Sequence, residues 1–144
     1  MSDRRIVSYS EDFLPEFKTK WALCGDVKCA VPVIIKPWEI KLVDLGIKSC
    51  VALKLYVRSS LPLNKGLILA NSVGIIDADY RWPIKAMLLN VTKEDVFIDV
   101  GDRICQIEPL QNCYNELIEK EDFENWDRIE ATERWEWGFG STWI

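Results

Sequence analysis

Histidine is absent from the 144-residue sequence. Without an imidazole, the chain has no side chain whose ordinary pKa lies close to 7. Histidine-based acid–base catalysis, the Ser-His-Asp triad and histidine metal ligation are therefore excluded. Any catalysis by this chain has to depend on carboxylates or on a hard metal ion.

Long hydrophobic runs are also absent, since no stretch of 18 apolar residues occurs. The first residues, Met1-Ser2-Asp3-Arg4-Arg5, lead into the mixed segment 9–12 instead of an apolar signal core. We therefore expect neither a membrane span nor a secretory signal, and we predict a cytoplasmic protein.

The cysteines are few, odd in number and without a Cys-x-x-Cys pair: Cys24, Cys29, Cys50, Cys105 and Cys113. Most of them lie inside apolar runs, which favours buried thiols over a metal site or a disulfide framework. Basic residues are outnumbered, and the net charge is −5. A broad nucleic-acid-binding face needs many Lys and Arg, so none is expected, although a few arginines could hold a small anion.

Hydrophobic residues make up 49% of the chain, enough for one compact domain with a sizeable core. The apolar or alternating runs are of strand length, rich in Val and Ile, and span residues 29–35, 40–43, 51–57, 66–69, 74–76, 84–90, 96–100 and 103–107. They predict an all-β barrel or sandwich. Residues 61–70 could hold a short helical turn, and residues 90–95 and 100–102 are expected to be turns.

The C-terminal part has a different composition. Residues 115–127 are acidic and poor in strand signals, and a glycine-containing tail follows. We interpret this end as an arm that leaves the barrel, with the barrel domain in residues 1–127 and the tail in residues 128–144. The acidic stretch is most simply a solvated face.

Four segments carry residues suited to chemistry. One is Gly74-Ile75-Ile76-Asp77-Ala78-Asp79-Tyr80-Arg81, preceded by Asn71; the others are Val57-Arg58-Ser59-Ser60-Leu61, Gly101-Asp102-Arg103-Ile104-Cys105-Gln106, and the tail from Arg134 to Ile144. Two carboxylates after a strand form a candidate site or a solvated turn. An arginine followed by two hydroxyls is suited to phosphate, although a helix cap has the same pattern.

In order and spacing these segments together resemble the motifs of the trimeric dUTPase family, from about Pro15 to the C-terminus. The first family motif matches weakly, in Ala22-Leu23-Cys24-Gly25-Asp26-Val27. The resemblance implies a jelly-roll-like β-barrel with a C-terminal arm, assembled as a homotrimer with shared sites. It implies hydrolysis of dUTP to dUMP and pyrophosphate, with Mg²⁺ as the cofactor and neither nucleic acid nor membrane as a partner.

The resemblance also implies a role for each matching residue. Asp77 would activate the attacking water, and Asp26 would act on Mg²⁺ through water. Uracil and deoxyribose would be bound by Asn71, Gly74, Ile76 and Tyr80. Phosphates would be bound by Arg58, Ser59, Ser60 and Gln106. The tail would close over the nucleotide through Arg134, Phe139, Gly140, Ser141 and Thr142.

Tryptophan stands at six positions where glycine is expected. The family pattern has glycine at positions 82, 135, 137 and 143 and commonly at 21, and position 38 follows Pro37 in a turn where Pro-Gly is expected; Trp126 has no such assignment. If these indoles are real, each one placed in a tight turn costs about 1–3 kcal/mol. Our hypothesis is instead that these codons are UGA and that the host reads UGA as glycine. The tryptophans would then come from translating the gene with a genetic code in which UGA means tryptophan. UGG at most of these codons would contradict it.

Two other functions stay open at this point. The related dCTP deaminase family shares the barrel and a nucleotide-closing tail. An inactive, dUTPase-like trimeric binding protein would result if the tryptophans are genuine.

Overall fold

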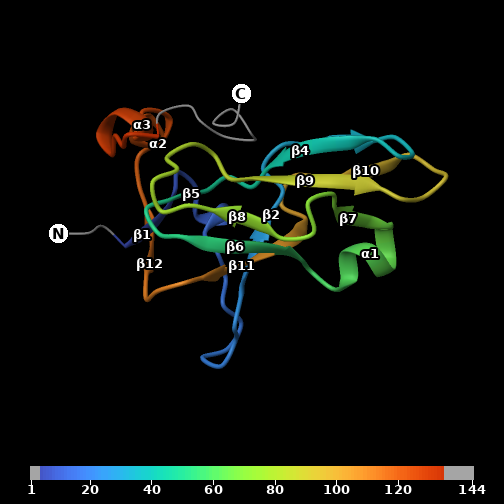
Figure 1. Cartoon of the computed structure of the whole chain (residues 1–144), viewed down its shortest axis with the longest axis horizontal. Helices are drawn as coiled ribbons and strands as arrows, with labels where there is room; N and C mark the ends of the chain where they lie inside the picture. The colour runs from blue at the N-terminus through green and yellow to red at the C-terminus, as the bar shows by residue number, and fades with distance from the viewer. Residues whose placement is uncertain (1–3, 135–144) are drawn as a thin grey trace.

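The computed structural model describes residues 4–134 as four small β-sheets with short helices (Figure 1). The largest sheet has the order β2 (Gly25–Lys28), β11 (Arg103–Pro109), β6 (Leu53–Val57) and β8 (Gly74–Ile76). The second has β4 (Ile40–Asp44), β9 (Lys85–Asn90) and β7 (Leu67–Leu69); the third pairs β10 (Val96–Ile98) with β3 (Val33–Ile35). The fourth has β12 (Tyr114–Leu117), β1 (Arg5–Ser8) and β5 (Lys48–Ser49). The predicted all-β fold is confirmed.

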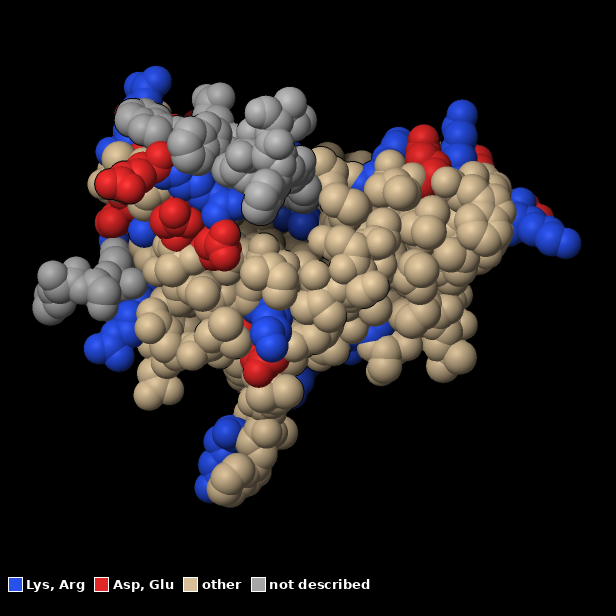
Figure 2. Space-filling model, in the orientation of Figure 1, with Lys and Arg blue, Asp and Glu red and all other residues tan. Residues whose placement is uncertain are grey.

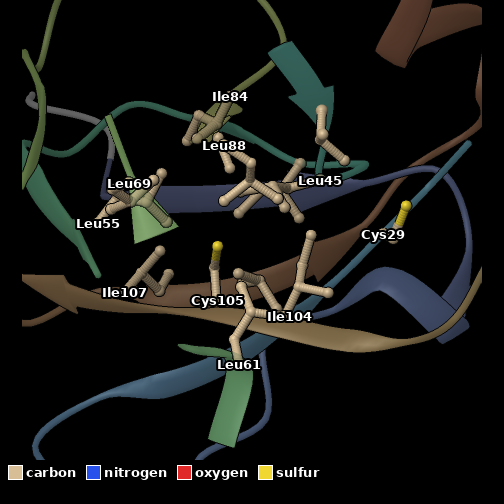
Figure 3. Packing of buried hydrophobic residues seen from close by; sticks show 14 of the residues in the cluster. Cys29, Leu45, Leu55, Leu61, Leu69, Ile84, Leu88, Ile104, Cys105 and Ile107 are labelled. Atoms are coloured by element: carbon tan, nitrogen blue, oxygen red, sulfur yellow. The ribbon is translucent and has the colours of Figure 1, made fainter. Parts of the chain in front are cut away.

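One main core joins these sheets, and its side chains meet from several strands in Figure 3. Strand β9 alternates between partly buried and buried residues, as expected for a strand with one face on a core. Cys29, Cys50 and Cys105 are buried, and Cys24 and Cys113 are partly buried. Desolvation raises the pKa of the Cys105 thiol, so this cysteine is an inert packing group.

The predicted helical turn is helix α1 (Ser60–Lys65). Pro62 lies in its first turn, where a backbone N–H has no partner within the helix. Gly66 ends the helix at a φ of 63°, and its N–H donates to the carbonyl of Pro62 over 3.0 Å. Proline and glycine thus limit the helix without preventing it.

Several sequence expectations were wrong. Three strands are shorter than the apolar runs that predicted them: β3 starts at Val33, β6 starts at Leu53 and β10 ends at Ile98. Pro32, which has no N–H to donate, directly precedes β3. The acidic arm is not poor in structure: β12 pairs in parallel with β1, and helices α2 (Lys120–Glu124) and α3 (Trp126–Ile129) follow. The 3-10 helix η1 (Glu11–Phe13) completes the elements.

A second hydrophobic cluster holds the two C-terminal helices against β1. It contains Val7, Cys50, Phe123 and Trp126, with Tyr9 and Ile118 at its margin. We call it the satellite core. The helices lie at one end of the molecule, beside β1 and β5 (Figure 1). Within residues 4–134, no helix is long and apolar enough to cross a membrane.

Candidate functional site

The carboxylate turn, residues 77–80, follows the end of β8. The N–H of Tyr80 donates to the carbonyl of Asp77 over 3.1 Å, which closes the turn. The side chain of Asp77 is 58% exposed and that of Asp79 is exposed to a similar degree. The carboxylates are therefore presented on a turn, within reach of water and of a ligand.

Arg134 from the far end of the chain lies on this turn. Its Nη1 donates to Oδ2 of Asp77 and, over 3.2 Å, to Oδ1 of Asp79. Its guanidinium lies 5.5 Å from the centre of the Tyr80 ring. The hydroxyl of Thr132 donates to the carbonyl of Asp79 over 2.5 Å. The structure thus brings together Asp77, Tyr80 and Arg134, three of the residues expected in the site.

Tyr80 is partly buried, and its ring centre lies 5.9 Å from that of Trp82. The hydroxyl donates to the carbonyl of Pro83 over 3.1 Å. Burial raises the pKa of Tyr80, and the positive charge of Arg134 partly opposes that shift. The ring therefore offers a neutral, fixed apolar surface beside the carboxylates.

Strand β8 carries the other residues expected to contact the base and sugar. Asn71 is exposed in the turn before the strand, next to Ser72, whose φ is 65°. At Gly74, an added Cβ would lie 3.0 Å from the Cβ of Leu55, so glycine lets β8 pack closely on β6. Ile76 pairs with Leu53. Asn71 and the carboxylate turn are thus at the two ends of one short strand.

A second group lies on the sheet β2-β11-β6. Asp26, Gln106 and Tyr56 are cross-strand neighbours on three adjacent strands. Nε of Arg58 lies 3.3 Å from Oδ1 of Asp26, whose side chain is only 13% exposed. Nε2 of Gln106 donates to the carbonyl of Val57 over 3.1 Å. We call Asp26, Arg58 and Gln106 together the basic end. The name refers to the guanidinium of Arg58, which is suited to binding phosphate.

The two serines after Arg58 begin helix α1. Ser59 occupies the N-cap position, but its side chain makes no capping hydrogen bond, so the helix-cap interpretation is not supported. Ser60 lines a hollow of about 250 Å³ with Leu61, Asn64, Lys65, Asp102, Arg103 and Ile104. Ser60 therefore borders a hollow close in sequence to Arg58.

The carboxylate turn and the basic end lie at opposite ends of β6. Strand β8 runs antiparallel to β6, and Ile76, just before Asp77, pairs with Leu53 at the start of β6. Arg58 directly follows Val57, where β6 ends. Five residue steps of ~3.3 Å separate these ends by roughly 17 Å. One chain alone does not bring Asp77 to Arg58.

A preformed metal site is not seen in the described part of the chain, where no group of three or more metal-ligating side chains occurs. Asp26, the residue expected to act on the metal, already pairs with Arg58.

Comparison with known proteins decides the family. The dUTPase family model matches residues 15–143. The chain belongs to the dUTPase family. It is 35% identical over 135 residues to the deoxyuridine 5'-triphosphate nucleotidohydrolase of Helicobacter pylori strain Shi470, with 90% of this chain and 88% of that one covered. The enzyme of the same name from Rickettsia canadensis is 38% identical over 137 residues, covering 90% of this chain and 87% of that one.

Solved structures agree with this assignment. The crystal structure of the Streptococcus mutans dUTPase superposes with a TM-score of 0.67 at 33% identity, covering 76% of this chain and 93% of that one. The Staphylococcus bacteriophage 80alpha dUTPase has a TM-score of 0.66 at 18% identity, covering 81% of this chain and 94% of that one, and shares the fold.

Some expected dUTPase site residues lie outside the described residues: Phe139, Gly140, Ser141 and Thr142. Trp135, Trp137 and Trp143 lie there too. Thr132, and Asp79 as a partner of Arg134, were not predicted from the sequence. No local signal could have revealed these contacts, because they join positions more than 50 residues apart.

Proposed function

We propose that this dUTPase-family protein hydrolyses dUTP to dUMP and pyrophosphate. The observation that carries the proposal is Asp77, an exposed carboxylate on a turn that directly follows the strand expected to contact the pyrimidine. A carboxylate within hydrogen-bond reach of a water can take its proton as the water attacks the α-phosphorus. No histidine is needed for this chemistry.

Arg134 has two successive roles in this proposal. In the structure it pairs with Asp77 and Asp79. A bound triphosphate offers it a more highly charged partner, with oxygens arranged for paired hydrogen bonds. Arg134 then clamps the γ-phosphate, Asp77 is released to hold the water, and the tail brings Phe139, Gly140, Ser141 and Thr142 over the nucleotide.

Specificity is assigned to β8 and its flanking turns. Asn71, together with backbone groups near Gly74 and Ile76, pairs with the 4-oxo and N3–H groups of uracil. The amino group of cytosine would leave these groups without partners. The fixed ring of Tyr80 packs under the deoxyribose and leaves no room for a 2′-hydroxyl.

The phosphates are assigned to the basic end, through Arg58, Ser59, Ser60 and Gln106. A magnesium ion at the basic end would supply positive charge to offset the negative charge that develops on the leaving pyrophosphate. Asp26 acts on the ion only through water, since its carboxylate is held 3.3 Å from Nε of Arg58.

A shared site in a homotrimer accounts for the distance between the two ends of β6. If the carboxylate turn of one chain faces the basic end of another, Asp77 and Arg58 meet on one nucleotide. Homotrimeric assembly, the cytoplasmic location and the lack of a nucleic-acid partner stay predictions.

The test is the release of pyrophosphate from dUTP, measured for the protein as written and for a version with glycine at positions 21, 38, 82, 135, 137 and 143. We predict turnover in the glycine version at least. Asp77→Asn should lower its kcat by about 10²-fold or more while dUTP still binds. Asp95→Asn, an exposed control, should leave kcat unchanged.

Other outcomes identify the alternatives. Ammonia released from dCTP would indicate a deaminase. No turnover of dUTP by either version, with dUTP bound weakly or not at all, would contradict the proposal and indicate a binding protein.

A further inference from the structure

We propose that Arg5 and Glu130 are positioning residues that fix the root of the C-terminal tail, so that Arg134 lies at the carboxylate turn. The tail root is defined as residues 130–134. The inference rests on the proposed function only for its kinetic consequence. The contacts that carry it lie outside the nucleotide site.

The tail root starts from a docked helical pair. Helices α2 and α3 have five and four residues, too short to be stable alone in water. They are held by the satellite core, in which Trp126 is only 2% exposed. The ammonium of Lys48 also donates to the carbonyl of Phe123 within α2. The docking on β1 therefore decides where α3 ends.

Arg5 fastens the end of α3 to the barrel. Its guanidinium lies 4.8 Å from the centre of the Trp126 ring. The same group pairs with Glu116 of β12 over 2.7 Å and with Glu130 over 2.6 Å. The side chains of Arg5 and Glu130 are 20% and 25% exposed, so their charge-assisted hydrogen bond is less screened than that of a fully exposed pair.

Glu130 is the last strongly held residue before the tail root reaches the carboxylate turn. Its N–H donates to the carbonyl of Trp126 over 2.8 Å, and its carboxylate binds Arg5. Two and four residues later, Thr132 and Arg134 contact the turn. Four residues span up to ~14 Å when extended. Without the Arg5–Glu130 pair, Arg134 would sample a much wider volume and meet its ligand less often.

The experiment compares Glu130→Ala with Glu133→Ala in the full chain. Both remove one carboxylate from the tail root, but Glu133 is exposed. Amide hydrogen exchange in residues 130–134, thermal midpoint, kcat and KM for dUTP are measured. Glu130→Ala should speed exchange in the tail root about tenfold and raise KM about tenfold, because Arg134 is no longer placed for its phosphate. The exchange of α2 and α3 should stay unchanged.

A conservative variant sharpens the test. Glu130→Gln keeps an acceptor for Arg5, so its KM for dUTP should lie between that of the parent and that of Glu130→Ala. Equal kinetics for the two alanine variants would overturn the proposal. Loss of protection throughout α2 and α3 would overturn it too, by showing a general structural role. If the parent chain releases no pyrophosphate from dUTP, the proposed function fails, whereas the exchange comparison still decides whether Glu130 fixes the tail root.

Discussion

Trp38 occupies a backbone conformation suited to glycine. The N–H of Glu39 donates to the carbonyl of Lys36 over 3.0 Å, which closes a four-residue turn with Pro37 and Trp38 at its centre. The φ of Trp38 is 62°. Proline followed by a residue of positive φ is the pattern of a type II turn, in which glycine is strongly preferred at the second central position. The indole is 69% exposed and so regains little by packing.

We predict that Trp38→Gly stabilises the protein. Relief of the left-handed backbone should raise the free energy of unfolding by about 1 kcal/mol. Urea unfolding of the two proteins measures the difference. A Trp38→Gly protein that is less stable than its parent would count against a glycine at this position.

Trp126, unlike the exposed Trp38, is a buried tryptophan. It is buried against Val7 and Phe123 and lies under the guanidinium of Arg5. Trp126→Ala should cost about 3–5 kcal/mol. Trp21 and Trp82 have φ outside the left-handed region. We therefore expect UGA at codon 38 and UGG at codon 126, and a peptide mass from the native source would show glycine at position 38.

At the scale of elements, the turn after β9 depends on one buried amide. The side-chain amide of Asn90 donates to the carbonyls of Ile35 over 2.8 Å and Glu94 over 2.7 Å. Its oxygen accepts from the N–H of Thr92 over 2.9 Å and from the hydroxyl of the same residue. The predicted turn at 90–95 is thereby confirmed, and it is tied to β3.

We predict that Asn90→Ala lowers the free energy of unfolding by about 2–4 kcal/mol, because several buried polar groups lose their partner. Asn64→Ala, on the exposed side of α1, should change it by less than about 0.5 kcal/mol. Denaturant unfolding of both variants measures these changes in the free energy of unfolding. Equal effects would show that the Asn90 network contributes little.

The elements predicted correctly have a pattern of apolar side chains that reflects which of their residues are buried. Strand β9 and most of β11 alternate or cluster apolar residues because they lie on the main core. Strand β12 has no such apolar pattern, because its side chains are mostly exposed. It is held by main-chain pairing with β1, which lies at the other end of the sequence. Phe123 and Trp126, which anchor α2 and α3, stand alone in an acidic stretch.

The residues of the candidate site could be predicted from the sequence, but their positions relative to one another in the fold could not. Asp77, Arg58 and Gln106 were identified from motifs in the sequence. That Asp77 and Arg58 fall at opposite ends of β6 follows from the antiparallel pairing of β8 with β6, which no spacing along the chain encodes. The contact of Arg134 with Asp77 depends on the docking of α2 and α3 and was equally out of reach.

At the scale of the whole molecule, the outer face of the sheet β4-β9-β7 is unusually apolar. Ile40, Leu42 and Ile68 are exposed there, and Figure 2 shows a broad area with few charged side chains over these strands. Exposed apolar patches commonly mark contact surfaces between proteins. We propose that other copies of the chain bind to this face, which would also allow the two site groups to meet.

We therefore predict that the active site is built from at least two chains, and complementation between two inactive variants tests this most directly. Asp77→Asn and Arg58→Ala, each made in the glycine version of the protein, should be inactive as homotrimers. When the two variants are denatured, mixed equally and refolded, about a quarter of the sites should receive both intact residues from different chains. Pyrophosphate release from dUTP should then rise to about a quarter of the parent rate. A mixture as inactive as its components, despite confirmed mixed trimers, would contradict the shared site.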